Sequence, residues 1–249
     1  MIILKSNREI ALMKKAGHIV AVVLAELTQK IKPGITTAYL DKLAANIIRK
    51  HHATPTFNGY NGFPANITTC INEELVHGIP SHKRFLEEGD IVSIDCGATY
   101  KGWIGDAATT VPVGQISPEA QRLLDVTEQS LYEGIEYAKA GKRAGDVSAV
   151  IQTYIERHGY AVVREYTGHG VGRKMHEDPQ VPNFGKRRKG VKLRRGMTIA
   201  LEPMVNMGVA ETRVLDDKWT VVTKDGQLSA HFEHTIAIMN GEAQILTQL

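Results

Sequence analysis

Three things are scarce in this sequence: cysteine, net charge and long apolar runs. Its two cysteines, Cys70 and Cys96, are too few for a disulfide framework, so we expect free core thiols in a reducing compartment. Its 30 basic and 27 acidic side chains leave a formal charge of only +3. Because proteins that bind DNA through its phosphates are usually more basic, we expect no DNA partner.

No segment is apolar over the length that a membrane span requires. The longest apolar run near the N-terminus covers residues 19–25, whereas a spanning helix needs roughly 20 such residues. Lys5 and Ser6 interrupt the first residues before an apolar stretch can build up, so the three-part layout of a secretory signal is missing. We therefore expect a cytoplasmic protein with no membrane partner.

The sequence has enough apolar material for a substantial core. Hydrophobic residues make up 43% and charged residues 23% of its 249 residues, which is typical of a folded globular protein. The length suits one large domain or two small ones. Because no linker-like or low-complexity segment divides the chain, we expect a single catalytic domain over residues 1–249.

The first predicted element is a long amphipathic helix. Ser6 and Glu9 have the spacing of a capping box, and apolar side chains recur behind them at helical intervals as far as Leu27. Pro33 and Gly34 would end this helix. The other predicted elements are a second helix capped by Thr37 and running to about His51, a loop with short strands over 54–69, strands over 91–95 and 103–111, helices over 118–140 and 146–158, and further strands to the C-terminus.

Two segments of the chain follow the same pattern, which suggests an internal duplication. Residues 89–95 and 196–202 each begin with glycine, continue as an alternating apolar strand and carry a carboxylate six residues after the glycine. Each part of the chain also begins with helices and ends in strands. One short match can arise by chance, so two pseudo-symmetric halves, roughly 1–115 and 116–249, are a hypothesis.

Asp95 and Asp106 are equally distant in sequence from the pair Tyr100-Lys101. A hairpin that turned there would place the two carboxylates directly opposite each other on one face. Opposed residues have Cβ atoms about 4.5–5.5 Å apart, and like charges at that distance destabilise a sheet. A pair of metal ions between them would relieve the repulsion. The alternative that one carboxylate faces solvent stays open, because a register shift of one residue would produce it.

Glu202 and Glu233 follow and precede apolar strand sequences, where an unpaired carboxylate is costly to bury. Both would need a cation or a base nearby. The turn at Asp217-Lys218 lies midway between them, so the second half of the chain is predicted to repeat the opposed pair of carboxylates through a longer hairpin.

Residues 167–177 place His169 and His176 among glycines. The glycines follow the pattern G-x-G-x-G rather than G-x-G-x-x-G, and no acidic ribose-binding residue follows, so a dinucleotide site is excluded. Glycines let the backbone close tightly around a ligand, which suits a histidine presented to a metal or a substrate. By itself His77 would be taken as an ordinary structural histidine.

Five segments together resemble type I methionine aminopeptidases. These segments are HGIP from His77, SIDCGATYKGWIGDAATT from Ser93, TGHGVGRKMHE from Thr167, ALEPMV from Ala200 and FEHT from Phe232. The resemblance extends from the first helix to the last strand. It implies the pita-bread fold, an α+β domain with pseudo-twofold symmetry in which an antiparallel sheet is flanked by helices. Because the chain starts directly at its first helix and has no helical insert of the type II kind, it resembles the short bacterial form.

The resemblance also implies a metal centre with two divalent ions per chain. The ligands carried over from the family are Asp95, Asp106, His169, Glu202 and Glu233. Four carboxylates balance the charge of two divalent ions, and the imidazole adds one nitrogen. Such a donor set suits cobalt, manganese, iron or zinc without selecting among them.

The activity implied by the resemblance is removal of the initiator methionine from proteins and peptides with a small second residue. The hypothesis is that a hydroxide activated by two metals attacks the first peptide bond. Glu202 would act as general base and then as proton donor to the leaving amine. His176 would stabilise the oxyanion, and His77 would hydrogen-bond the scissile amide.

By resemblance, the side chain of methionine would be bound by Tyr60, Phe63, Met175 and Trp219, which offer apolar and aromatic surface to a thioether. Phe63 stands where relatives often have Tyr, and Met175 where Phe is common. Without the resemblance, Tyr60 and Phe63 would simply be aromatic residues that pack a loop.

The expected partners are the N-termini of nascent polypeptides, and we expect a monomer. A basic cluster over 186–195 could touch ribosomal RNA, although such a cluster is more often a solvated loop face. The resemblance also suggests a monovalent cation near Asn72 and Ser229.

Three alternatives stay open. An aminopeptidase P or prolidase would share the metal ligands, but it usually carries an added N-terminal domain. A non-catalytic binding module of the same fold would be expected to have lost ligands, and all five are present here. An RNA-binding protein that uses the basic cluster would bind RNA in a salt-sensitive way without hydrolysing peptides.

Overall fold

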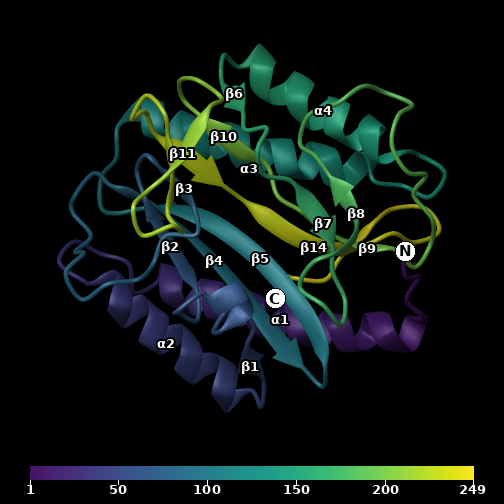
Figure 1. Cartoon of the computed structure of the whole chain (residues 1–249), viewed down its shortest axis with the longest axis horizontal. Coiled ribbons are helices and arrows are strands. Elements are labelled where there is room, and N and C mark those ends of the chain that lie inside the picture. Colours follow the sequence, from purple (N-terminus) through teal and green to yellow (C-terminus); the bar gives the residue numbers. More distant parts are fainter.

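The computed structural model describes residues 1–249 and is built from a large antiparallel sheet and four long helices (Figure 1). The helices are α1 (Asn7–Thr28), α2 (Thr37–Lys50), α3 (Pro118–Tyr137) and α4 (Ala144–Arg157), with a short 3₁₀ turn η1 (Tyr60–Gly62). The strands are β1 (Thr54–Pro55), β2 (Thr68–Ile71), β3 (Glu74–Val76), β4 (Ile91–Tyr100), β5 (Trp103–Pro112), β6 (Ala161–Val162), β7 (Gly168–Gly170), β8 (Glu177–Val181), β9 (Thr198–Leu201), β10 (Met204–Asn206), β11 (Thr212–Val214), β12 (Val221–Thr223), β13 (Ser229–His231), β14 (Glu233–Ala237) and β15 (Gln244–Ile245). None of the helices combines the length and apolar character that crossing a bilayer requires.

The helix starts follow from side-chain caps. The capping box predicted for α1 is present, because Ser6 N donates to Glu9 Oε2 and Glu9 N donates to Ser6 Oγ. The cap of α2 is Thr36, whose hydroxyl accepts from Tyr39 N at 3.2 Å, so the prediction of Thr37 was wrong by one residue. The Thr37 hydroxyl instead donates to the carbonyl of Ser81.

The helices also end earlier than predicted. The first helix stops at Thr28, five residues before Pro33, and α3 and α4 stop at Tyr137 and Arg157. Helix ends fray and depend on local capping geometry, so these differences move no side chain of the predicted site.

The main sheet has nine antiparallel strands in the order β1-β4-β5-β14-β9-β7-β8, with β2 beside β4 and β15 beside β14. The two central neighbours, β5 and β14, are separated by more than 100 residues of sequence. Two small three-stranded sheets, β13-β10-β6 and β11-β12-β3, extend this framework.

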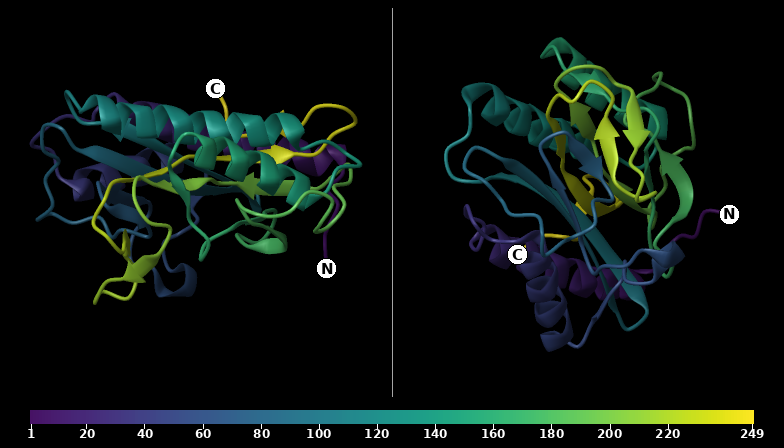
Figure 2. Two further views of the ribbon diagram at one scale, coloured as in Figure 1. Left: turned by 90° about the horizontal axis from the view of Figure 1, so that it is seen from above. Right: turned by 60° about the vertical axis from the view of Figure 1, so that its left-hand side comes forward.

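The helices gather on one side of the main sheet, and loops project from its other side (Figure 2, left). One apolar core lies between the sheet and the pair α3 and α4, and a second lies between the sheet and the pair α1 and α2. A third, smaller core joins residues of the loops to the first part of α1 and to the C-terminal segment. Both predicted core thiols, Cys70 and Cys96, are buried and free.

The helix α1 lies directly against the backbone of β5. A Cβ atom added at Gly105 would be 2.4 Å from the amide nitrogen of Gly17, and one added at Gly17 would be 2.3 Å from the carbonyl oxygen of Leu246. Only glycine permits such an approach. Gly17 is therefore the point at which α1 is fixed between the sheet and the C-terminal segment.

The repeated sequence pattern corresponds to a repeated hydrogen-bond arrangement. Gly89 N donates to Val113 O at 2.9 Å, and Val113 N donates back to the carbonyl of Asp90 at 2.8 Å. In the second half, Gly196 N donates to Ile238 O at 2.9 Å, and Ile238 N donates back to the carbonyl of Met197 at 2.8 Å. Both glycines have positive φ, 95° and 88°.

The two halves meet along β5 and β14, where a second repeated feature lies. The Thr110 hydroxyl donates to His231 O and accepts from His231 N. In the same way, the Thr235 hydroxyl donates to Asp106 O and accepts from Asp106 N. Thr110 is four residues after Asp106, and Thr235 is four residues after His231. Asp106 and His231 therefore occupy equivalent positions in the two halves.

Candidate metal centre and active site

A cavity of about 220 Å³ is lined by residues of the main sheet and of the loops beside it. All eleven side chains predicted to form the site lie on its wall, and these are Tyr60, Phe63, His77, Asp95, Asp106, His169, Met175, His176, Glu202, Trp219 and Glu233. They come from both halves of the chain. The structure thus brings the predicted residues together, while their roles stay predictions.

The hairpin of β4 and β5 places Asp95 and Asp106 on one face but not directly opposite each other. Tyr100 pairs with Trp103, so the turn is Lys101-Gly102, and Asp95 lies opposite Ala108. Both turn residues have positive φ, as a tight two-residue hairpin turn requires. The predicted direct opposition was wrong because Gly102 moves the turn one residue onward. The two carboxylates are diagonal neighbours, whose Cβ atoms are typically about 7–8 Å apart or less.

The second half has the register that the sequence predicted. In the ladder between β9 and β14, Leu201 pairs with His234, and one further step brings Glu202 opposite Glu233. The outer strands β11 and β12 pair about the same midpoint, with Val214 opposite Val221. These two carboxylates therefore face each other across neighbouring strands.

His169 lies on β7 with its ring directed at the carboxylates. Its Nδ1 is 2.9 Å from the carbonyl oxygen of Gly170. Because a carbonyl only accepts, Nδ1 carries the hydrogen and Nε2 has a free lone pair when the ring is neutral. That Nε2 lies 3.7 Å from Asp106 Oδ2 and 3.5 Å from Glu202 Oε1. This orientation is the one expected of a metal-binding imidazole.

Burial disfavours charge throughout this cluster. It raises the pKa of Asp106 to about 7, and burial together with neighbouring carboxylates raises the pKa values of Asp95, Glu202 and Glu233 well above their usual range. Burial lowers the pKa of His169 to about 4. No lysine or arginine lines the cavity to compensate the acidic groups.

The cluster fits divalent metal ions. Three carboxylate oxygens in it are buried without any hydrogen-bond partner, one each from Asp95, Asp106 and Glu233. Asp106, His169 and Glu233 also offer ligand atoms that lie within 4.8 Å of one another. Carboxylates with one imidazole are a common donor set for first-row divalent metals.

His77 and His176 lie beside this cluster. His77 has a left-handed backbone, with φ of 62°, which is uncommon outside glycine and often marks functional positions. Its ring meets the edges of Tyr166 and Trp219, with ring centroids 5.7 and 6.5 Å away. Burial and the neighbouring His176 lower the pKa of His77.

The ring of His176 is held between two neighbours. Its Nδ1 is 2.7 Å from the Tyr60 hydroxyl, and its centroid is 4.2 Å from that of His169. The loop behind it is fixed by Glu177, which forms a buried ion pair with Lys5 at 2.6 Å and accepts from the backbone nitrogen of Arg173. The loop therefore presents the ring of His176 to the cavity in a defined position.

The apolar end of the cavity combines both halves of the chain. The rings of Phe63 and Trp219 meet edge to face with centroids 5.2 Å apart. Met175 and Phe63 are each only 5% exposed, and both belong to the same small core. This end can surround an unbranched apolar side chain next to the carboxylates.

Eight of the 19 residues of the cavity wall were not predicted from the sequence, and one of them faces the carboxylates. His231 is buried, and its Nε2 lies 3.8 Å from Glu202 Oε2 and 3.9 Å from Glu233 Oε2. It is two residues before Glu233, so strand periodicity could have placed it on the same face. Tyr166 and Thr68 also line the cavity, and no sequence signal singled them out.

Comparison with known proteins identifies the family. The sequence matches metallopeptidase family M24 over residues 11–240. The chain belongs to this family. It is 53% identical over 249 residues to methionine aminopeptidase 1 of Bacillus subtilis, with all of both chains covered. It is 52% identical over 247 residues to a methionine aminopeptidase of Clostridium acetobutylicum, with 99% of each covered.

Solved structures of other proteins show the fold. The methionine aminopeptidase of Thermotoga maritima matches with a TM-score of 0.99 at 47% identity, and all of both chains are covered. An Xaa-Pro dipeptidase from Bacillus anthracis matches with a TM-score of 0.81 at 24% identity, covering 99% of this chain and 62% of the other. The second likeness concerns the fold alone. The predicted pita-bread fold is therefore confirmed for this M24 member, and the family implies a peptidase that uses divalent metal ions.

Proposed function

We propose that this protein removes the initiator methionine from the N-terminus of nascent proteins and peptides, preferring a small second residue. The observation that carries this proposal is one cavity in which four carboxylates and an imidazole lie beside an apolar end. The relatives that are about half identical over their full length are named methionine aminopeptidases. The resulting enzyme is a hydrolase that acts on the first peptide bond.

The proposed metal ligands are Asp95, Asp106, His169, Glu202 and Glu233, and we propose two divalent ions per chain. Cobalt, manganese, iron and zinc all suit this donor set. Two observations support this ligand set: carboxylate oxygens without hydrogen-bond partners, and a free lone pair on Nε2 of His169. Ions bound there would polarise the scissile carbonyl and lower the pKa of water.

The proton would be handled by Glu202. Burial and the neighbouring carboxylates raise the pKa of Glu202 well above its usual range, which suits a group that must take a proton and later release it to the leaving amine. His176 would donate a hydrogen bond to the oxyanion, and His77 would hydrogen-bond the scissile amide. Removing either imidazole should then lower turnover more than metal content.

The methionine side chain would occupy the apolar end of the cavity, between Tyr60, Phe63, Met175 and Trp219. The edge-to-face packing of Phe63 against Trp219 and the low exposure of Phe63 and Met175 support a pocket for this side chain. A thioether in contact with aromatic ring edges gains about 0.3–1.5 kcal/mol per contact. The pocket has no charged group at its apolar end, which favours methionine over lysine or arginine.

Hydrolysis of the peptide Met-Ala-Ser, with and without added metal, tests the proposed function. Wild-type protein should release methionine only with metal, and the Asp95→Ala variant should be inactive under both conditions. A Gly-Pro peptide separates this activity from that of a prolidase. Preference for Gly-Pro, or metal-independent hydrolysis, would contradict the proposal. Retained turnover in His77→Ala after metal is restored would contradict only the role given to His77.

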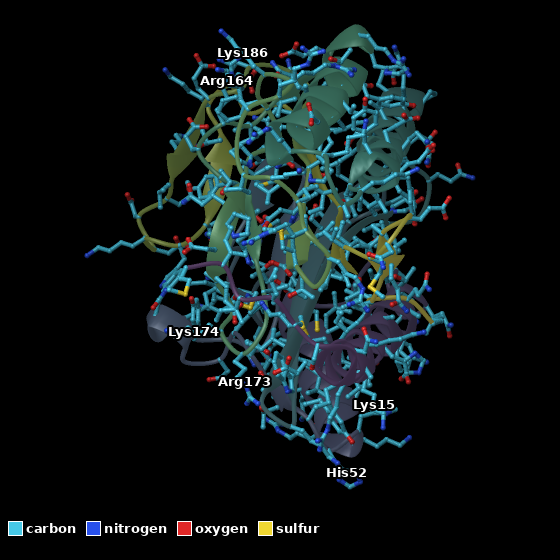
Figure 3. All side chains as sticks on the ribbon, turned by 90° about the vertical axis from the view of Figure 1, so that its right-hand side faces the viewer. Lys15, His52, Arg164, Arg173, Lys174 and Lys186 are labelled. Atoms are coloured by element: carbon cyan, nitrogen blue, oxygen red, sulfur yellow. The ribbon has the colours of Figure 1, made fainter.

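The remaining proposals concern the setting of the enzyme. We propose a cytoplasmic monomer, organised as a single catalytic domain of two pseudo-symmetric halves. The basic cluster over 186–195 lies on an exposed loop, and Lys186 is at the end of the molecule opposite Lys15 and His52 (Figure 3). A transient contact with the ribosome through this loop predicts co-sedimentation with ribosomes that decreases as salt rises.

A further inference from the structure

His231 has no role in the function proposed above, yet it is one of four histidines on the cavity wall. Its side chain is 2% exposed, and its Nε2 is a buried polar atom without a hydrogen-bond partner. Buried polar atoms in native proteins nearly always have a partner. An atom left without one beside an active site therefore requires an explanation.

The groups that face this nitrogen are two carboxylates. Nε2 lies 3.8 Å from Glu202 Oε2 and 3.9 Å from Glu233 Oε2. The other oxygen of Glu202 faces His169 at 3.5 Å. The carboxylate of Glu202 is thus placed between two imidazoles, one on each side.

The two imidazoles present opposite hydrogen-bonding character to Glu202. His169 gives its Nδ1 hydrogen to the carbonyl of Gly170, so its Nε2 offers a lone pair. Around His231 Nε2 the nearby oxygens belong to carboxylates, which only accept when they are ionised. A hydrogen on Nε2 of His231 is the arrangement that satisfies these atoms, and it makes this ring a donor rather than a metal ligand.

The position of His231 is fixed by its backbone. The hydroxyl of Thr110 accepts from its N–H at 2.9 Å and donates to its C=O at 2.8 Å. These bonds fix the backbone of His231, so the base of its side chain keeps its place beside the carboxylates. A shift of roughly 0.8 Å by either carboxylate brings its oxygen to an ordinary hydrogen-bond distance of about 3.0 Å.

We propose that His231 is a positioning residue whose Nε2–H holds the carboxylates of Glu202 and Glu233 in the orientation in which they bind metal. The proposal rests on the proposed function, because it assigns a partner to two of the proposed ligands. Groups that hydrogen-bond metal ligands typically change metal affinity or activity 10–100-fold when they are removed.

The test compares two substitutions at this position. His231→Leu fills the space but cannot donate, whereas His231→Gln retains an N–H group that can reach the carboxylates. The control is His234→Leu, since the His234 ring bonds to Thr247 and alternation along β14 directs it away from the side of the sheet that Glu233 faces. Circular dichroism establishes that each variant is folded before it is measured.

The readouts are Mn²⁺ affinity by titration calorimetry and the separate kcat and KM for Met-Ala-Ser at saturating metal. We expect His231→Leu to bind Mn²⁺ about 10–100-fold more weakly and to lose kcat, with KM changed less than about twofold. His231→Gln should recover both quantities to within about threefold of the wild type. The control should bind Mn²⁺ as the wild type does.

Two results would overturn the proposal. One is wild-type Mn²⁺ affinity and kcat in His231→Leu. The other is a His231→Gln variant as weak as the Leu variant, with a changed absorption spectrum of bound Co²⁺, which would make the nitrogen itself a ligand. Failure of the wild-type protein to bind metal or cleave the peptide would instead contradict the proposed function, and it is measured first.

Discussion

The two halves of the sheet build the cavity wall on the same backbone but with different side chains. In the first half, Asp95 faces Ala108, and Asp106 lies two residues away on the diagonal. In the second half, Glu202 faces Glu233 directly, and His231 occupies the position equivalent to Asp106. Ala108 and Glu233, which are equivalent by the same correspondence, pair with each other where the halves meet.

This difference distinguishes the residues that maintain the fold of both halves from the residues that form the proposed metal centre. The hydrogen bonds that repeat are made by the main chain or by the hydroxyls of Thr110 and Thr235. The positions that diverge are those whose side chains face the cavity. A symmetric wall would give two equal sets of donors, whereas the observed wall has one carboxylate at the junction and three of its four imidazoles on the second half. The divergence lets Glu233 reach ligands of both halves.

The largest expected effect comes from the residue at which the halves differ most. Asp106→Ala removes a carboxylate that lies close to both His169 and Glu233. We expect peptide hydrolysis to fall by more than about 10²-fold. Even the removal of a residue that hydrogen-bonds a metal ligand typically lowers metal affinity or activity 10–100-fold. Calorimetric titration should show weakened or absent Mn²⁺ binding. Asp125→Asn, an exposed carboxylate on α3, should change neither quantity. Wild-type metal binding in Asp106→Ala would refute the assigned ligand set.

A second comparison concerns how the helices of each half rest on the sheet. A Cβ at Gly17 of α1 would meet main-chain oxygen of Leu246 at 2.3 Å, whereas one at Gly134 of α3 would meet the side-chain ends of Ile151 and Leu201 at 2.7–3.0 Å. Side-chain ends can move and a backbone cannot. We expect Gly17→Ala to cost about 3 kcal/mol or more of unfolding free energy, beyond the usual range for overpacking.

Gly134→Ala should cost about 1 kcal/mol or less, because helix propensity favours alanine by nearly that amount. Urea denaturation of both variants checks the difference. Equal costs would show that α1 and the C-terminal segment can separate as easily as side chains move. Peptide hydrolysis by folded Gly134→Ala should match the wild type, since this contact lies on the helix side of the sheet.

The third prediction concerns the metal-free protein and its dependence on pH. The pKa of Asp106 is raised to about 7 in the folded state from an ordinary value of 3.8. A carboxyl with a raised pKa favours folding only while it is protonated, so its contribution is lost as pH rises from about 4 to about 7. As pH rises from 5 to 8, the free energy of unfolding of metal-free Asp106→Asn should therefore increase by on the order of 2–3 kcal/mol relative to that of the wild type.

The imidazoles act in the opposite direction. The pKa values of His169 and His231 are lowered by burial to about 4 and about 3, so the folded state loses stability as pH falls below about 6.5. Because both proteins in the comparison contain these rings, their effect cancels in the difference. Urea unfolding in the presence of a chelator measures that difference. A constant difference between pH 5 and pH 8 would contradict the raised pKa of Asp106.

Much of the fold could be predicted because local rules determine it. The capping box at Ser6, the hairpin from β4 to β5 and the midpoint shared by Glu202 and Glu233 each depend on residues close in sequence or on strand alternation. The exact register of the first hairpin could not be predicted from spacing alone. The left-handed preference of Gly102 determines it, and spacing does not report turn type.

The composition of the cavity was harder to predict than its metal-facing residues. Strand alternation could have placed His231 on the face of Glu233, although the structure divides the two residues between the short strands β13 and β14. Tyr166 lines the cavity and contacts His77, a residue distant from it in sequence. Such contacts depend on the packing of the two halves, which local patterns do not describe.

The smallest expected effects concern the pocket that both halves share. Phe63→Tyr and Met175→Phe alter one residue from each half, and each keeps apolar or aromatic surface against Trp219. Swaps of this kind usually cost less than about 1.5 kcal/mol when volume is nearly kept. We expect kcat/KM for Met-Ala-Ser to stay within about threefold of wild type in Phe63→Tyr. Met175→Phe adds volume to a site that is 5% exposed, so its change should be larger and should affect KM. A change above about tenfold in Phe63→Tyr would mean that the first half of the chain determines the pocket more strongly than the second.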